Sequence, residues 1–215
     1  ALGADVAVQT KDRRSAVMLA ARGGHDAVVG VLVAAGASVE VVDGNGWTAL
    51  HHACTEGRES VVRCLIKHGA DVKAAATDGR TPLVLAAAGG HDGVVDLLVA
   101  AGAAVGAVDG NGWTALHDAC ANGHDAVVRR LMQHGADVHV RAGNERTALM
   151  VAARRGHLGV VDTLVAAGVA VSDVEFEGWT ALLYACADGH EAVVRRLMAL
   201  GADVAVQTKD RRSAV

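Results

Sequence analysis

The chain has 215 residues and carries 20 Lys and Arg against 24 Asp and Glu, for a formal net charge of −4. This balance, without any long basic run, argues against nucleic acid as a main partner. The longest apolar stretches, such as 28–35, are interrupted by glycine far short of the roughly 20 residues that a membrane span needs, so membrane insertion is not expected.

The chain is periodic along its whole length. Glycine recurs with a 33-residue period, and one register consists of Gly36, Gly69, Gly102, Gly135, Gly168 and Gly201. A fixed period of this size indicates a repeat architecture. The period divides the chain into six full units flanked by two partial ones, namely 1–9, 10–42, 43–75, 76–108, 109–141, 142–174, 175–207 and 208–215.

A second, doubled period separates two alternating types of unit, as the equal spacing of Trp47, Trp113 and Trp179 shows. The first seventeen residues, ALGADVAVQTKDRRSAV, recur unchanged at 199–215, three pairs of units later. The second copy keeps the register of the glycines. We therefore expect the chain to be a window onto a longer periodic array.

The unit 109–141 shows the elements that the sequence predicts, in chain order. Its first four residues, Asp-Gly-Asn-Gly, have turn chemistry. Thr114 precedes an apolar stretch of helical period and suits a helix N-cap, and that first short helix ends at Gly123. His124 opens a second helix, which we expect it to cap, and Gly135 suits the left-handed position after that helix. Two such helices cannot bury their own apolar faces, so the units must stack on one another.

This unit resembles the ankyrin repeat. The resemblance rests on the 33-residue period and on four motifs, T-A-L-H at 48–51 and 114–117, T-P-L at 81–83, G-H at 90–91 and 123–124, and G-A-D-V at 69–72 and 135–138. It implies an all-α fold over 1–215 as a single domain: an ankyrin-type helix–turn–helix solenoid with β-turn fingers, stacked as a superhelix. Fingers and first helices would form a concave face. Pro82 is the only proline, and the other units have Ala at its position.

Cysteine usage gives a weak indication of compartment. Cys54, Cys120 and Cys186 share one register two units apart, about 16–20 Å if the layers are about 8–10 Å apart, so they are too far apart for disulfides. We expect them, with Cys64, to be free thiols and the three to be buried. Free thiols favour a reducing compartment such as the cytoplasm, as does the lack of a signal-peptide pattern or glycosylation site.

Residues for catalysis, cofactors or metals do not gather in the sequence. The pairs His51/Cys54 and His117/Cys120 each supply only two ligands, and the third unit of this type has Leu183 in place of the histidine. No Ser/His/Asp or Cys/His set stands out. We expect a protein that is not an enzyme and that has no cofactor and no metal site.

Cationic and indole side chains alternate at the fifth position of successive units. The series is Arg14, Trp47, Arg80, Trp113, Arg146, Trp179 and Arg212. At a layer spacing of about 8–10 Å, a guanidinium can reach within about 6 Å of a neighbouring indole. One interpretation is a cation–π ladder between repeats, and the other is two independent surface positions inherited from the duplication of a pair of units.

The residue after each T-A-L-H equivalent varies between units. It is His52, Asp118 and Tyr184 in alternate units and aliphatic in the others. Ankyrin-type binders use such positions for their partners, so these three residues are the candidate contacts of a protein partner on the concave face.

Three functional hypotheses follow. The first is a structural scaffold, a filament-like or spring-like element within a long ankyrin solenoid, whose partner is the same chain through end-to-end or lateral assembly. The second is an adaptor that binds a protein partner on its concave face. The third is an engineered or averaged repeat sequence.

Overall fold

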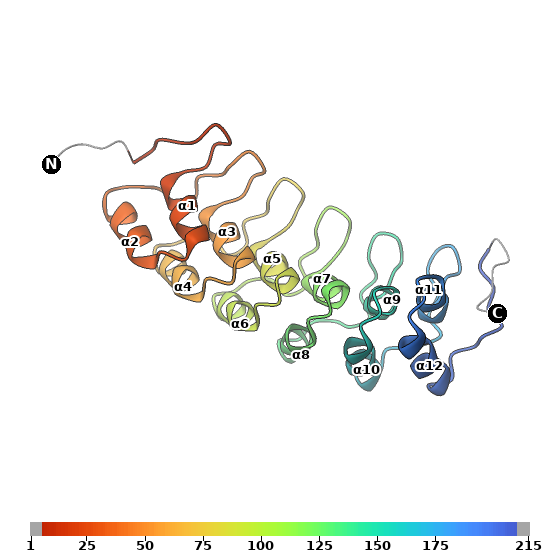
Figure 1. Ribbon diagram of the computed structural model, residues 1–215. Coiled ribbons are helices and arrows are strands. Elements are labelled where there is room, and N and C mark those ends of the chain that lie inside the picture. Colours follow the sequence, from red (N-terminus) through yellow and green to blue (C-terminus); the bar gives the residue numbers. More distant parts are fainter. Residues whose placement is uncertain (1–5, 210–215) are drawn as a thin grey trace. The chain divides into compact units, whose positions relative to one another are not determined.

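The computed structural model describes residues 6–209 (Figure 1). Arg212 of the proposed ladder lies outside this range. The chain forms two compact units, Ala1–Gly110 and Asn111–Val215. A single domain over 1–215 therefore stays a prediction.

Twelve helices make up the regular structure of the described residues. The first unit holds α1 (Ala16–Gly23), α2 (Asp26–Ala34), α3 (Ala49–Thr55), α4 (Glu59–Lys67), α5 (Pro82–Ala88) and α6 (Asp92–Ala100). The second unit holds α7 (Ala115–Asn122), α8 (Asp125–Gln133), α9 (Ala148–Arg154), α10 (Leu158–Ala166), α11 (Ala181–Ala187) and α12 (Glu191–Ala199). The expected all-α helix–turn–helix repeat is confirmed.

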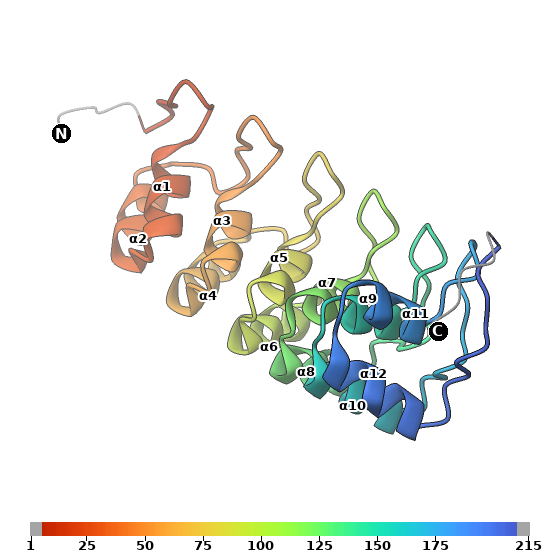
Figure 2. The same ribbon diagram turned by 45° about the vertical axis from the view of Figure 1, so that its right-hand side comes forward.

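The helices stack in two rows within each unit. In the first unit α1 packs on α3 and α3 on α5, while α2 packs on α4 and α4 on α6. In the second unit α7, α9 and α11 form the corresponding row, with α8, α10 and α12 behind them. Figures 1 and 2 show the hairpin-like fingers projecting beside the first helix of each repeat. The core thus lies between successive repeats, because the two helices of a single repeat cannot enclose a core on their own.

The first helices begin at threonine or serine caps. Thr114 forms a capping box with His117 and α7 ends at Gly123 with φ 74°, as the sequence predicts. Thr48 and His51 form the same box at α3. The Nδ1 of His51 accepts from the backbone N–H of Thr48 at 3.1 Å, and its Nε2 donates to the carbonyl of Arg80 in the next repeat at 3.3 Å. The T-A-L-H motif therefore both starts a helix and joins two repeats.

A second histidine joins its repeat to the one before it. The expectation that it caps the second helix is wrong, because the histidine side chains at these N-cap positions make no capping hydrogen bond. Nε2 instead donates to a carbonyl of the preceding repeat, in the pairs His91 to Thr55 (3.0 Å), His157 to Ala121 (3.1 Å) and His190 to Arg154 (2.8 Å).

These histidine rings need a glycine beneath them. A Cβ at Gly57 would lie 2.5 Å from Nδ1 of His91, and a Cβ at Gly156 would lie 2.6 Å from Nδ1 of His190. Both glycines also have positive φ, 65° and 76°, which favours glycine. We call each such pair a Gly–His junction.

Neighbouring fingers are joined by backbone hydrogen bonds. The amide of Gly44 donates to the carbonyl of Asp12 at 3.2 Å, and the amide of Thr77 donates to the carbonyl of Asn45 at 3.0 Å. In the second unit the amide of Gly143 donates to the carbonyl of Asn111 at 3.0 Å. Bonding from finger to finger therefore supplements helix packing within each unit.

All four cysteines are free thiols. Cys54 and Cys120 are buried, and burial raises the pKa of both. Cys186, also expected to be buried, is only half-buried, because no helix layer follows α11 and α12 in the described part of the chain.

Within residues 6–209, no helix combines the length and apolar character needed to cross a bilayer. The same residues contain no group of three or more His, Cys, Asp or Glu side chains placed to hold a metal ion.

Candidate functional site

Two hollows of the same design lie in the described residues, one lined by residues of the first unit and one by residues of the second. The first-unit hollow has a volume of about 270 Å³ and is lined by Arg14, Arg22, Asn45, Trp47, His52, Thr55 and Glu56. The second-unit hollow has a volume of about 280 Å³ and is lined by Arg146, Arg154, Glu175, Glu177, Trp179, Tyr184, Ala187 and Asp188. Every residue of the first list has a counterpart four repeats later in the second list.

Two consecutive repeats build each hollow. One repeat supplies both arginines, and in the first unit these are Arg14, next to the N-cap of α1, and Arg22, in the last turn of α1. The next repeat supplies the rings, since Trp47 precedes the N-cap of α3 and His52 lies in its first turn. The register of the stack thus brings guanidinium groups of one layer against rings of the following layer.

A buried ionic group lies behind the first-unit hollow. Nε2 of His52 is 3.0 Å from Oδ2 of Asp43, and Nε of Arg14 is 3.9 Å from the same oxygen. The Trp47 and His52 rings are tilted at 59° with centroids 5.2 Å apart. Nε of Arg14 is buried and has no hydrogen-bond partner among the described residues. A buried polar atom without a partner is uncommon in folded proteins and marks this group as unusual.

Burial and hydrogen bonding act in opposite directions on this pair. Burial would raise the pKa of Asp43, but hydrogen bonds from the amides of Trp47 and Asn45 and from His52 outweigh it, so the pKa is lowered. Burial lowers the pKa of His52, and its bond to Asp43 offsets this only in part. At neutral pH a neutral imidazole therefore donates Nε2–H to a carboxylate.

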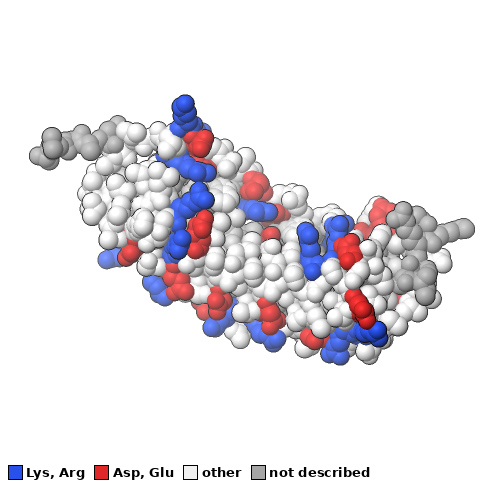
Figure 3. All heavy atoms as spheres, in the orientation of Figure 1, with Lys and Arg blue, Asp and Glu red and all other residues white. Residues whose placement is uncertain are grey.

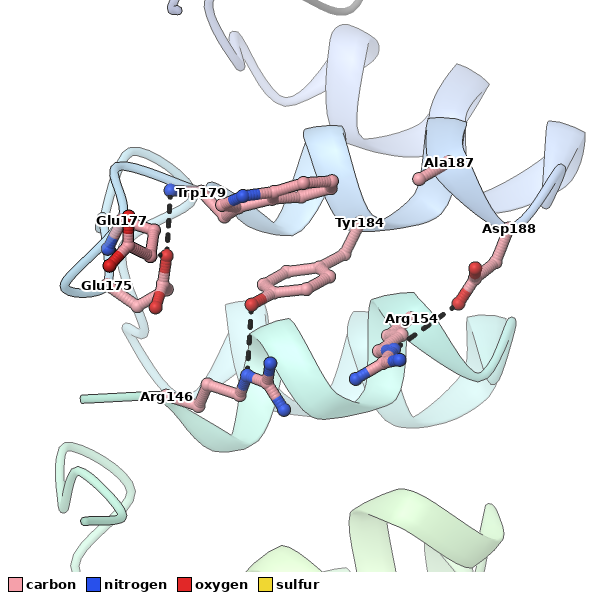
Figure 4. A pocket seen from close by; sticks show the side chains of 8 residues that line it. All are labelled: Arg146, Arg154, Glu175, Glu177, Trp179, Tyr184, Ala187 and Asp188. Carbon is pink, nitrogen blue, oxygen red and sulfur yellow. Dashed lines mark hydrogen bonds and ion pairs between the residues drawn. The ribbon is translucent and has the colours of Figure 1, made fainter. Parts of the chain in front are cut away.

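In the second-unit hollow a phenol replaces the imidazole. Nε of Arg146 donates to Oη of Tyr184 at 2.9 Å, and Cζ of Arg146 lies 5.2 Å from the centroid of that ring (Figure 4). Cζ of Arg154 lies 5.7 Å from the same centroid, and its Nε is 3.4 Å from Asp188. Trp179 stacks on Tyr184 with centroids 4.9 Å apart. The two guanidinium groups share one aromatic platform.

The arginines of the expected ladder make other contacts within each unit. Arg14 lies near Asp43, and Arg146 contacts Tyr184. Cation–π pairs within the described residues place cations over Tyr184 and Phe176. In the second unit Tyr184 stands between Arg146 and the indole. The guanidinium–indole ladder itself stays a prediction.

The three expected partner contacts are buried. His52 is 5 % exposed, and Asp118 and Tyr184 are each 6 % exposed. His52 and Tyr184 serve instead as walls of the two hollows. Their role as direct partner contacts stays a prediction.

Two charged pairs at the hollows were not among the residues that sequence reasoning singled out. Arg22 pairs with Glu56 at 3.3 Å, and Arg154 pairs with Asp188 at 3.4 Å. The signal was present, because both pairs recur four repeats apart while the intermediate copy has Ala88 and Asn122. Comparison of charged positions across four repeats would have identified them.

Charge is intermixed on the face of the molecule that Figure 3 shows. Basic and acidic side chains lie next to one another, with no broad region of one sign. The arginine pairs of the hollows are therefore local features.

Stacked helix–turn–helix layers with fingers define a repeat scaffold of the α-solenoid class. The family model "Ankyrin repeats (3 copies)" matches residues 1–76, 73–142 and 138–208, and the chain belongs to this family. The crystal structure of the human ASB11 ankyrin repeat domain is similar, with a TM-score of 0.87 and 26 % identity over 94 % of this chain and 90 % of that one. No curated protein matches the sequence. Ankyrin repeats act as protein-interaction scaffolds and are typically non-catalytic.

Proposed function

We propose that the chain is a non-enzymatic scaffold within a periodic ankyrin array and acts as a filament-like or spring-like element. The observation that carries this proposal is the repetition of the Gly–His junction, which joins His91, His157 and His190 to the repeat before each. A series of like bonds spreads a load over many layers. Stability in such a stack is a sum of repeat and nearest-neighbour terms.

Electron microscopy and mass measurement of the native material test this proposal. We expect filaments, or a native mass well above the 21.8 kDa of this chain. Compact single particles with a mass near that value would contradict it.

The junctions are tested separately by a matched pair of variants. His157→Ala removes the bond to Ala121, whereas His139→Ala changes an exposed histidine of the same unit. We expect about 1 kcal/mol lower stability and a broader unfolding transition for the first variant only. Equal stability and equal unfolding breadth in the two variants would contradict a stabilising role of the Gly–His junctions.

A second candidate function is an adaptor that binds a protein partner on the face formed by fingers and first helices. The two equivalent hollows favour this function because finger and first-helix residues line both of them, and because Nε of Arg14 lacks a partner in the first. A one-to-one complex that is lost on changes at the hollows would support the adaptor over self-assembly.

A further inference from the structure

The two hollows share a chemistry that the fold by itself does not require. We propose that each hollow binds a carboxylate side chain of an acidic segment in a protein partner, so that this part of the chain offers two like sites, one in each unit. The proposal rests on the adaptor function and names its partner chemistry.

The second-unit hollow shows the arrangement most clearly. The guanidinium groups of Arg146 and Arg154 lie on the same side of Tyr184 in Figure 4, at 5.2 and 5.7 Å from its centroid. Only Nε of Arg146 is engaged by Tyr184, and the terminal nitrogens of Arg146 have no hydrogen-bond partner among residues 6–209. Asp188 already pairs with Nε of Arg154, so the terminal nitrogens of Arg146 are the free donors among the residues that line this hollow.

The first-unit hollow is lined by Arg14 and Arg22, the counterparts of Arg146 and Arg154. The buried Nε of Arg14 lacks a hydrogen-bond partner in the described chain, and the guanidinium of Arg22 pairs there with Glu56. That ion pair is half-exposed on both sides, at 55 % and 37 %. Exposed pairs contribute little stability, so a ligand carboxylate can take the place of Glu56 at little cost.

The shape and donor geometry indicate a carboxylate. The planar guanidinium fork matches a carboxylate in two parallel hydrogen bonds. The volumes of about 270 and 280 Å³ are below the roughly 300–1,000 Å³ of small-molecule pockets, so each hollow suits one side chain of a larger partner. The indoles of Trp47 and Trp179 offer apolar contact to the methylene groups of Asp or Glu.

The two sites are expected to differ in strength. Glu175 and Glu177 also line the second-unit hollow, where Asn45 is the counterpart of Glu177 in the first. Oε1 of Glu175 is held by the amides of Glu177 and Trp179, at the finger end of the hollow. The added acidic charge predicts weaker carboxylate binding in the second unit.

The sequence supplies an internal control. At the register halfway between the two hollows it has Ala88 where the others have their second arginine, and Asp118 in place of His52 or Tyr184. Trp113 therefore marks a register without the arginine pair.

The experiment is a titration of the full, ¹⁵N-labelled chain with a deca-glutamate peptide, followed by the indole N–H signals of the three tryptophans. We expect the signals of Trp47 and Trp179 to shift, with tighter binding at Trp47, and the signal of Trp113 to stay in place. The net charge of −4 makes this result diagnostic, because overall charge repels the probe.

Single substitutions assign the effect. Arg154→Gln should weaken binding reported by Trp179 at least tenfold and leave binding reported by Trp47 unchanged, and Arg22→Gln should do the reverse. Arg195→Gln, which removes an exposed charge of α12 bonded to Glu191, should change neither. For Arg154→Gln and Arg22→Gln, the two indole signals that do not report on the changed hollow show that the variant is folded.

The proposal would be overturned by no shift with deca-glutamate, by an equal shift with deca-lysine, or by equal weakening in Arg195→Gln. Saturation by inorganic phosphate with no response to deca-glutamate would replace the carboxylate with a phosphate ligand and would also overturn it. None of these outcomes affects the scaffold proposal, which electron microscopy and the junction variants test.

Discussion

The two hollows have the same backbone frame and the same pair of arginines but different central rings. In the first unit His52 turns toward Asp43 in the finger of its own repeat, at 3.0 Å. In the second unit Tyr184 reaches Arg146 in the preceding repeat, at 2.9 Å. The ring residue and the finger acid both differ, His52 with Asp43 in the first unit and Tyr184 with Glu175 in the second. The bond made by the ring residue lies within a repeat in the first unit and between repeats in the second. The stacking of repeats thus determines which side chains lie close together. The identity of each residue determines whether its hydrogen bond is made within its own repeat or to the neighbouring repeat.

The largest expected effect tests whether the core under the two hollows is equivalent. Leu50 and Leu182 occupy the same register and are almost fully buried. Leu50→Ala and Leu182→Ala should each lower the free energy of unfolding by about 2–5 kcal/mol, since each leaves a cavity. Urea unfolding followed by circular dichroism measures this. Met198→Ala, at an exposed position, serves as the control, and a loss confined to one of the two leucine variants would show that the frames differ.

A second comparison concerns the acid in the finger. Asp43 and Glu175 each accept two backbone N–H bonds within the finger, but only Asp43 also binds the ring in the first turn of the next helix. Asp43→Ala should cost about 1.5–3 kcal/mol, because hydrogen bonds to a charged group are lost and His52 is left buried without its acceptor. Glu175→Ala should cost less. Urea unfolding of both variants measures the two losses. A larger loss for Glu175→Ala than for Asp43→Ala would contradict the added role of Asp43.

The histidine makes the first unit sensitive to acid. The pKa of His52 in the folded chain lies below its ordinary value of 6.5, so the unfolded chain takes up the proton first and stability falls as the pH drops below about 6.5. The lowered pKa of Asp43 has the same sign, with its loss below its ordinary value of 3.8. His52→Tyr should therefore reduce the loss of stability between pH 7 and pH 5.

Part of that loss should remain in the variant, because burial also lowers the pKa of His51. Unfolding free energies measured by urea titration at several pH values give the comparison. The reciprocal Tyr184→His should increase the acid sensitivity of the second unit. An unchanged pH profile in both variants would rule out this register as its source.

The smallest effect concerns the phenol. Tyr184→Phe keeps the stack on Trp179 but removes the acceptor of Arg146 Nε. We expect a loss of about 0.5–1.5 kcal/mol and a change in tryptophan fluorescence. Thr163→Val, at a buried polar residue away from the hollow, is a control for the fluorescence, and an unchanged free energy of unfolding in Tyr184→Phe would contradict a stabilising bond between Arg146 and Tyr184.

Local chemistry made most of the fold predictable. The 33-residue period, the cap at Thr114 and the left-handed Gly123 each depend on neighbours in sequence or on plain repetition, and the structure confirms the helices they delimit. The direction of His91 was not predictable in this way, because its acceptor is the carbonyl of Thr55 in the preceding repeat. A side chain at an N-cap position can bond to the first turn of its own helix. That His91 bonds to the preceding repeat instead is evident only when that repeat is in place.

The candidate site was predictable only in part. The alternation of Arg and Trp pointed to the correct edge of the repeats, and His52 and Tyr184 were singled out as variable. Their burial was not foreseen, because both hollows are lined by residues of two repeats and the contacts between repeats cannot be read from one repeat alone. Arg22 lies in the last turn of its helix, where an exposed arginine is ordinary until the partner layer is placed.

The Gly–His junction has a consequence for how such a gene can change. Every full repeat has the glycine, and each has the histidine except one, where Arg58 donates from Nε to the carbonyl of Arg22 at 3.2 Å instead. Each full repeat thus has a glycine that leaves room for the side chain of the following repeat, and a histidine or arginine that bonds to the preceding repeat. Recombination between repeats can therefore insert or delete a pair of 33-residue repeats and still leave every such glycine facing a histidine or arginine of the next repeat. The junction by itself therefore sets no limit on the number of repeat pairs that can follow one another.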